Sequence, residues 1–228
     1  MSENTYDKSS RGVSVRVKTA KRRTISSSLW LKRQLNDPYV VKARKEGYRS
    51  RAAYKLIEIN EKHEFLKKGL HVVDLGAAPG GWSQVAVEKV GFDNVIGLDL
   101  LEVPAVAGAN IFQMDFMDDD APAKLKELMP RVDIVLSDMA PNASGQPNLD
   151  HLRIILLVEA AFDFACEVLS PNGVFVAKVW QGGTEHKLLE KMKQYFTTVK
   201  HVKPKASRQD SAETFVVAQG FRGQQKNL

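Results

Sequence analysis

Apolar and polar positions alternate along this chain with two different periods, and each period marks one kind of secondary structure. Short apolar runs, typical of buried strands, take turns with stretches in which apolar residues recur every three or four positions, as on one face of a helix. This alternation predicts an α/β fold with a mostly parallel, doubly wound sheet. The predicted strands are His71–Gly76, Asn94–Leu100, Ile111–Phe116, Asp133–Asp138, Gly173–Val179 and Thr214–Phe221, and the predicted helices are Trp82–Val90, Ala123–Met129, Leu152–Leu169 and Glu185–Phe196.

The N-terminal region has a different pattern. Residues 1–28 contain few apolar residues and no sustained period, so we expect a flexible tail there. From Leu29 to His63 the period is helical, with an interruption near Pro38. A length of 228 residues suits one domain with an extension. We therefore predict a basic tail over residues 1–28 and a single domain over 29–228, in which Thr198–Val202 is a candidate outer strand.

Charge is distributed unevenly between these regions. Residues 1–55 hold 15 Lys and Arg against 4 Asp and Glu, a net charge of +11, whereas the remaining residues hold 18 against 23, a net charge of −5. A basic arm of this kind suits the phosphates of a nucleic acid, although a charge run is as often only a solvated tail. If the arm binds RNA, Arg22, Arg23, Arg49 and Arg51 are the candidates for phosphate contacts.

Several classes of protein are disfavoured by composition. A single cysteine, Cys166, excludes an internal disulfide and a multi-cysteine zinc site, and the five histidines lack ligand spacing, so we expect no metal. The longest apolar stretch, Ile154–Ala165, contains two acidic residues and is too short to cross a bilayer. Lys8–Ser28 faintly resembles an organelle transit peptide, but no signal peptide is present. We expect a monomeric, cytoplasmic protein without a membrane span.

The strongest local motif runs from Val73 to Ser83 and joins a predicted strand to a predicted helix through small residues. Glycine allows a ligand to approach the backbone there, and the helix N-terminus offers free N–H groups. A phosphate-binding P-loop would carry lysine where Trp82 stands. The dinucleotide fingerprint would carry glycine where Ala78 stands. The motif therefore favours a nucleotide-like ligand other than a nucleoside triphosphate or a nicotinamide cofactor.

Two aspartates follow at the ends of the next two predicted strands. Asp99 could accept hydrogen bonds from both ribose hydroxyls of an adenosyl group, and Asp115 could accept one from the adenine amino group. Either aspartate alone would more often be a cap or a surface residue. Because ligands of open parallel sheets bind at the carboxyl ends of the strands, the pair beside a glycine loop favours S-adenosylmethionine.

Charged residues also interrupt three apolar segments, which are Ser137–Asn142, Val176–Trp180 and Ser211–Phe215. Lys178 stands between Ala177 and Val179, and lysine is rarely buried unless it is paired or functional. The alternative is an outer-edge lysine whose ammonium group reaches water.

At this point the chain resembles the FtsJ/RlmE family of ribose 2′-O-methyltransferases of large-subunit ribosomal RNA. The resemblance extends from about Ser26 to Gly220 and covers several motifs in the same order. They are Ser27-Ser28-Leu29-Trp30-Leu31, Arg49-Ser50-Arg51-Ala52 with Lys55-Leu56, the loop Asp74–Ser83, Ser137–Asn142, Phe175–Val179 and Ser211–Phe215.

The resemblance implies a Rossmann-like methyltransferase sheet whose last strand is reversed. It also implies a catalytic set formed by Lys55, Asp138, Lys178 and Glu213, and cofactor contacts at Gly80, Trp82, Asp99, Asp115 and Asp138. The implied substrate is ribosomal RNA of the large subunit, methylated on a uridine in the A loop of 23S-type RNA. The short segment between Asp99 and Asp115 departs from the family pattern, as do the longer basic tail and Ala212.

The chemistry gives each residue of this set a hypothetical role. A ribose hydroxyl is a poor nucleophile until a base takes its proton, and free lysine is protonated at neutral pH. Burial and a second cation, Lys55, could lower the pKa of Lys178 so that it acts as the base. Asp138 would hold Lys178 and face the sulfonium, and Glu213 would orient the ammonium groups or the ribose.

Two other functions are consistent with the sequence. The chain could be a Rossmann-type module that binds RNA without chemistry, its buried charges forming a structural network. Alternatively, the same chemistry could act on a transfer RNA anticodon loop or an mRNA cap. The compact chain, which lacks a large C-terminal domain, favours ribosomal RNA.

Overall fold

The computed structural model describes residues 24–141, 145–180, 185–209 and 211–223. The chain forms two compact units, Met1–Gly47 and Tyr48–Leu228, which are described separately below. Most of the predicted tail, with Arg22 and Arg23, lies outside the described residues, as does Asn142. The boundary expected after residue 28 falls inside the first helix, because that helix begins at Ile25.

The first unit contains two helices, α1 (Ile25–Asn36) and α2 (Pro38–Glu46). The interruption predicted near Pro38 is confirmed. The Asp37 side chain accepts a hydrogen bond from the backbone N–H of Tyr39, and Pro38 occupies the first turn of α2, where its missing N–H costs nothing. Gly47 ends α2 in the left-handed conformation, with φ of 83°.

The second unit is built on a seven-stranded sheet in the order β3-β2-β1-β4-β5-β7-β6. The first five strands pair in parallel, whereas β7 pairs antiparallel with both neighbours, which confirms the mostly parallel sheet with one reversed strand. The strands are β1 (Val72–Leu75), β2 (Val95–Asp99), β3 (Ala109–Gln113), β4 (Val132–Ser137), β5 (Leu169–Trp180), β6 (Phe196–Val202) and β7 (Glu213–Phe221).

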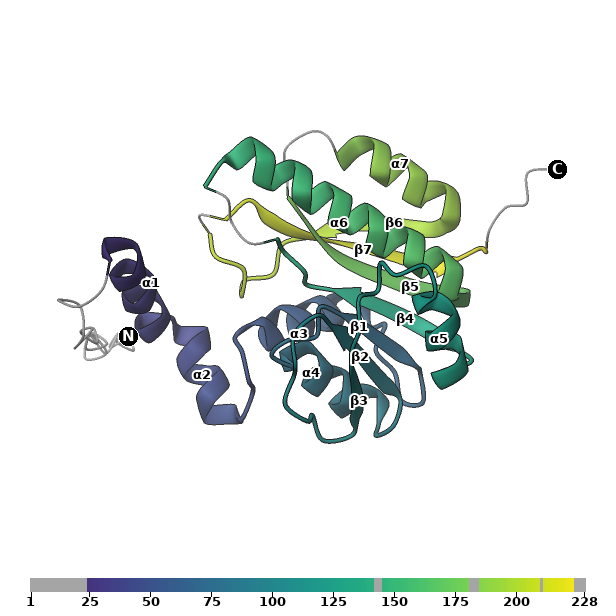
Figure 1. Ribbon diagram of the computed structural model, residues 1–228, viewed down its shortest axis with the longest axis horizontal. Coiled ribbons are helices and arrows are strands. Elements are labelled where there is room, and N and C mark those ends of the chain that lie inside the picture. The colour runs from purple at the N-terminus through teal and green to yellow at the C-terminus, as the bar shows by residue number, and fades with distance from the viewer. Residues whose placement is uncertain (1–23, 142–144, 181–184, 210, 224–228) are drawn as a thin grey trace, which may run out of the picture. The chain divides into compact units, whose positions relative to one another are not determined.

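Helices cover both faces of this sheet, so the unit has three layers (Figure 1). The helices α3 (Ala52–His63) and α4 (Gly81–Val90) pack on one face, and α5 (Ala121–Leu128), α6 (Pro147–Val168) and α7 (Glu185–Tyr195) pack on the other. β1 and β4 are buried along their whole length, as strands covered on both faces must be. None of the helices among the described residues has the length and apolar character needed to traverse a membrane.

Three elements differ clearly from the sequence prediction, and one of them is β5, which begins at Leu169 and not at Gly173. β3 spans Ala109–Gln113, so Asp115 follows the strand instead of ending it. The chain leaves the sheet there because Asp115 accepts hydrogen bonds from the backbone N–H groups of Met117 and Asp118 and so forms a turn. α6 begins at Pro147, earlier than the predicted Leu152, because proline is well suited to the first helical turn.

The order of the strands fixes where a ligand can bind. From β1 the chain moves outward through β2 to β3 and then returns to place β4 on the other side of β1. At such a reversal the connections diverge and leave a crevice at the carboxyl ends of the strands. The glycine loop after β1 and the segments after β2, β3 and β4 all reach this crevice.

Candidate active site

The two-residue period of the strands brings the charged residues onto one face of the sheet. Lys178 on β5 points to the side where α3 packs, as do the neighbouring residues Val174 and Val176. Glu213 begins β7 on the same side, because Phe215 two positions later packs there as well. The reversal of β7 places its first residue beside the end of β5, where Glu213 pairs with Trp180. The fourth group, Lys55, comes from α3.

Four charged side chains therefore converge, namely Lys55, Asp138, Lys178 and Glu213. The Lys178 Nζ lies 2.8 Å from Asp138 Oδ1 and donates to the Asp138 carbonyl oxygen at 2.6 Å. The Lys55 Nζ lies 2.9 Å from Glu213 Oε1 and 3.3 Å from both oxygens of Asp138. Lys178 Nζ and Glu213 Oε2 are 3.8 Å apart. Each carboxylate thus contacts both ammonium groups.

Both lysines are buried, each with only 7% of its surface exposed, so Lys178 is not an edge lysine that reaches water. Burial opposes ionisation of Glu213. Nevertheless, the ammonium groups of Lys55 and Lys178, with hydrogen bonds from Lys55 and Ser207, hold the pKa of Glu213 below its ordinary value. Two cations and two anions form a neutral group, which limits the cost of burying them.

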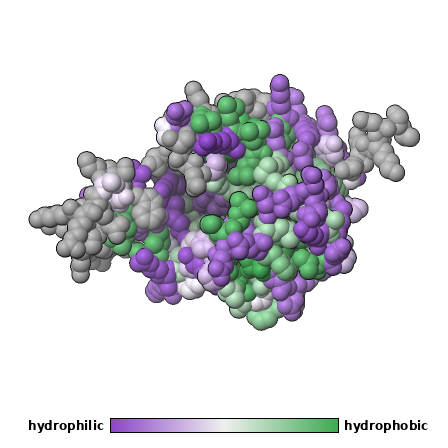
Figure 2. All heavy atoms as spheres, viewed as in Figure 1, coloured by the Kyte–Doolittle hydropathy of each residue, from purple (hydrophilic) through white to green (hydrophobic). Residues whose placement is uncertain are grey.

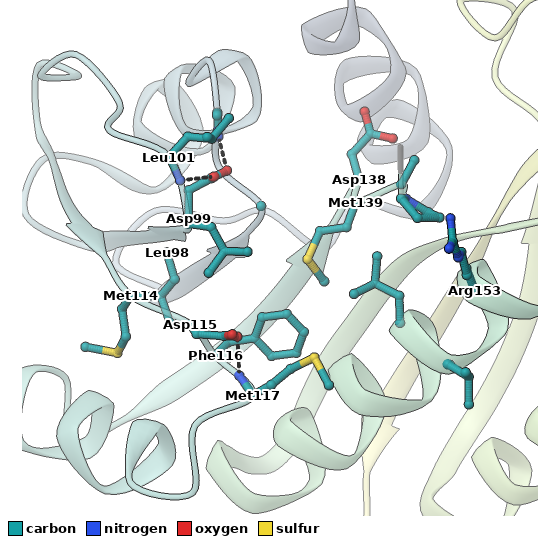
Figure 3. A pocket seen from close by; sticks show the side chains of 17 residues that line it. Leu98, Asp99, Leu101, Met114, Asp115, Phe116, Met117, Asp138, Met139 and Arg153 are labelled. Carbon is teal, nitrogen blue, oxygen red and sulfur yellow. Dashed lines mark hydrogen bonds between the residues drawn. The ribbon is translucent and has the colours of Figure 1, made fainter. Parts of the chain in front are cut away.

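A cavity of about 780 Å³ opens beside this group, and Asp138 belongs to both. Figure 3 shows Asp99 and Asp115 on one side of it, with Asp138 and Arg153 across from them. Most of the lining is apolar, and apolar surface borders the hollow in Figure 2. The apolar side chains lining it are Leu98, Leu100, Leu101, Met114, Phe116, Met117, Met139, Leu156 and Leu157.

The glycine loop forms one wall of the cavity. Gly76 lines it with φ of 73°, and a β-carbon there would lie 2.3 Å from the Met139 side chain. Gly80 precedes α4 with φ of 103°, and a β-carbon there would meet Val106 and Arg49. The Trp82 side chain is buried away from the cavity, and its indole N–H donates to the Ala52 carbonyl oxygen at 2.8 Å.

Asp99 and Asp115 both line the cavity, and different backbone N–H groups hold their carboxylates. The Asp99 carboxylate accepts the backbone N–H groups of Ala78 and Leu101, both at 2.8 Å. Asp115 accepts the backbone N–H of Met117 at 2.9 Å. Because a carboxylate has about four acceptor sites, both aspartates keep capacity for a ligand while the backbone fixes their orientation.

A further carboxylate, Asp74 on β1, lies beneath the loop and is only 1% exposed. Burial raises its pKa to about 7, and Asp138 and Asp99 add to the rise, although a 2.7 Å hydrogen bond from Ser83 opposes it. Between its ordinary value and about 7, the folded protein keeps a proton on Asp74 that the unfolded chain has released. The contribution of Asp74 to stability therefore falls as pH rises through this range.

We expect Asp74→Asn to stabilise the ligand-free protein at alkaline pH. Asparagine removes the buried charge and still accepts from Ser83, so the free energy of unfolding should rise by on the order of 4 kcal/mol at pH 8.5, where wild-type Asp74 is ionised. At pH 5, in the lower part of the range, the rise should be less than half as large. Denaturant titrations at both pH values measure this, with the exposed Asp119→Asn as the control. A gain of equal size at both pH values would contradict the assignment.

Arg49 and Arg51, two of the four arginines expected to contact phosphates, have partners within the protein. Arg49 donates to the carbonyl oxygens of Pro79, Pro104 and Ala105, and Arg51 donates to that of Ala206. Both side chains thus hold in place the loops that carry these carbonyl groups.

Arg153 is a charged residue at the cavity that was not identified from the sequence. It is the one Lys or Arg among the lining residues that the structure describes. The leucines at positions 149, 152 and 156 recur with helical spacing on the side of α6 that carries Arg153. They are exposed, whereas apolar residues that face the core are buried, so this stripe marks a surface next to the cavity.

Other reactive groups offer no second site. Within the described ranges, no cluster of three or more His, Cys, Asp or Glu side chains could hold a metal ion. Burial raises the pKa of the Cys166 thiol to about 12, which makes this cysteine unreactive.

The sheet order with its reversed strand, the glycine loop and the charged group beside the cavity define a Rossmann-like methyltransferase. The chain belongs to the FtsJ-like methyltransferase family, whose model matches residues 48–221.

Relatives support this assignment along nearly the whole chain. A protein of Paramagnetospirillum magneticum named ribosomal RNA large subunit methyltransferase E is 61% identical, over 94% of this chain and 91% of its own. A protein of Bradyrhizobium diazoefficiens with the same name is 56% identical, over 92% and 94%. A crystal structure described as a ribosomal RNA methyltransferase of Plasmodium falciparum superposes with a TM-score of 0.69 at 32% identity, over 78% of this chain and all of that one.

Proposed function

We propose that this protein is an S-adenosylmethionine-dependent methyltransferase of large-subunit ribosomal RNA, acting in the cytoplasm on the 2′-hydroxyl of a uridine in the A loop of 23S-type RNA. The observation that carries the proposal is the contact between the charged group and the cavity, which share Asp138. The relatives named as large-subunit methyltransferases support the choice of RNA.

The cavity fits the proposed donor in size and chemistry. Its volume of about 780 Å³ falls in the range of small-molecule sites, and its lining is apolar with a few polar groups. Asp99 and Asp115 are placed to accept hydrogen bonds from ribose and adenine groups, and the apolar side chains can cover a purine. Asp138 supplies a negative charge at the inner end, where a positively charged sulfur would be stabilised.

When bound, S-adenosylmethionine supplies a methyl group on a positively charged sulfur. Lys178, after releasing its own proton to solvent, would accept the proton of the ribose 2′-hydroxyl, the oxygen to which the bound donor would supply its methyl group. Asp138 fixes Lys178 through its side chain and its carbonyl oxygen. Glu213 and Lys55 complete the group and orient the ribose, so that alignment of the reacting atoms contributes to the rate.

The basic N-terminal unit is proposed to bind the RNA backbone. Its described cationic residues are all exposed, and they are Lys32, Arg33, Lys42, Arg44 and Lys45. Exposed cations suit phosphate contacts, whose affinity falls steeply with salt.

The test is methyl transfer to defined RNAs. The protein should transfer labelled methyl groups from S-adenosylmethionine to large ribosomal subunits from cells that lack this enzyme, and nucleoside analysis should recover 2′-O-methyluridine. Transfer RNA and capped mRNA serve as competing substrates. Label on a base, or preferential label on transfer RNA or the cap, would contradict the proposal. Binding of RNA without transfer would identify a non-catalytic module.

A further inference from the structure

A loop that the mechanism does not use lies against the charged group. It connects β6 to β7 and holds both backbone polar groups of Ala206 against α3. The Ala206 N–H donates to Glu58 Oε2 at 3.0 Å, and the Ala206 carbonyl oxygen accepts from Arg51. Arg51 is the N-cap of α3, and Lys55 and Glu58 follow it on one side of the helix, because residues three and four positions apart are neighbours there. The helix that presents Lys55 therefore also fixes this loop.

The next residue of the loop, Ser207, contacts the charged group directly. Ser207 is 3% exposed, and its hydroxyl donates to Glu213 Oε1 at 2.8 Å. Lys55 Nζ lies 2.9 Å from the same oxygen and 3.0 Å from Glu213 Oε2, and Lys178 Nζ lies 3.8 Å from Oε2. The Ser207 hydroxyl contacts Oε1 alone, so it distinguishes two oxygens that Lys55 contacts almost equally.

We propose that Ser207 is a positioning residue for methyl transfer: held by Arg51 and Glu58 through Ala206, it fixes the orientation of the Glu213 carboxylate between Lys55 and Lys178. The inference rests on the proposed function. It assigns a role to a residue that contacts neither the cavity nor the reacting atoms and acts only through Glu213.

Electrostatics favour the same role. The Ser207 hydroxyl is one of the groups that lower the pKa of Glu213. The charged groups facing that carboxylate are Lys55 from α3 and Lys178 from β5, with Asp138 beyond them. Without the hydroxyl, Glu213 keeps both cations and loses the one neutral donor that it has among the described residues. The carboxylate should then titrate at higher pH and take more than one orientation.

The experiment compares Ser207→Ala with a matched control, Thr214→Val, in the full-length protein. Thr214 is also buried, and its hydroxyl donates to the Val202 carbonyl oxygen at 2.9 Å, away from Glu213. Ser207→Ala is expected to lower kcat about tenfold, because a hydrogen bond to a charged group is lost. The KM values for S-adenosylmethionine and RNA should stay unchanged. The Glu213 pKa, followed by carbon-13 NMR, should rise. Thr214→Val should change neither kcat nor that pKa.

Wild-type kcat and an unchanged Glu213 titration in Ser207→Ala would overturn the inference. So would an equal loss of kcat in Thr214→Val, because the effect would then reflect general stability. If the wild-type protein transfers no methyl group to any RNA, the proposed function fails by itself. The titration of Glu213 in the two variants still decides the role of Ser207 in that case.

Discussion

Lys178→Ala is expected to lower kcat by about 10²- to 10⁴-fold, the usual contribution of a general base. The Lys178 ammonium group lies 2.8 Å from Asp138 and 3.8 Å from Glu213, and no other described side chain occupies the same position beside the cavity. The affinity for S-adenosylmethionine should be nearly unchanged, because Lys178 does not line that cavity. Single-turnover methyl transfer and equilibrium binding measure the two quantities separately.

Removing one member of a buried charged group can also destabilise the fold. Lys178→Met, which keeps most of the side-chain volume, therefore accompanies the alanine variant, and cofactor affinity reports whether each variant is folded. Lys200→Ala is the control, because Lys200 is an exposed lysine of the same sheet. Substantial turnover in folded Lys178→Met would show that another group takes the proton.

Asp99→Ala should have the opposite signature and weaken binding of S-adenosylmethionine about 100-fold, because hydrogen bonds to a charged group are lost. The Asp99 carboxylate also holds the backbone N–H groups of Ala78 and Leu101, so the wall of the cavity loses its support. Isothermal titration calorimetry measures the dissociation constant, and kcat at saturating cofactor should change much less.

Asp119→Ala is the matched control for this prediction. Asp119 is an exposed aspartate near the same end of the sheet and does not line the cavity. An unchanged dissociation constant in Asp99→Ala would remove Asp99 from the cofactor contact and would leave Asp115 and Asp138 as the remaining carboxylates of the cavity.

Hydrophobic periodicity was sufficient to predict the layers of the fold and most of its elements. It failed where local hydrogen bonds override the period. The apolar pattern continues to Phe116, but the turn made by Asp115 ends pairing at Gln113. The helical period also runs on across Gly47, so periodicity gives no sign of the two units there, because their separation depends on tertiary contacts.

Asp138, Lys178 and Glu213 could be noticed because they interrupt apolar segments, whereas Lys55 was implied only by the family resemblance. Their convergence follows from the two-residue period and from the reversal of β7, which the family resemblance implied. Ser207 could not be found in this way, because a serine in a polar loop is unremarkable until the loop is seen against α3. The same holds for Arg49 and Arg51, whose partners are backbone carbonyl oxygens that no side-chain pattern reveals.

The late position of Glu213 has a consequence for the biosynthesis of the enzyme. Lys55 and Glu213 are 158 positions apart, so at about 5–20 residues per second roughly 8–30 s of translation separate them. Until β7 is made, β5 lacks its outer neighbour, and Asp138 is the one carboxylate of the charged group that Lys55 and Lys178 can contact. We expect a polypeptide that stops before β7 to transfer no methyl group, because the charged group is incomplete without Glu213.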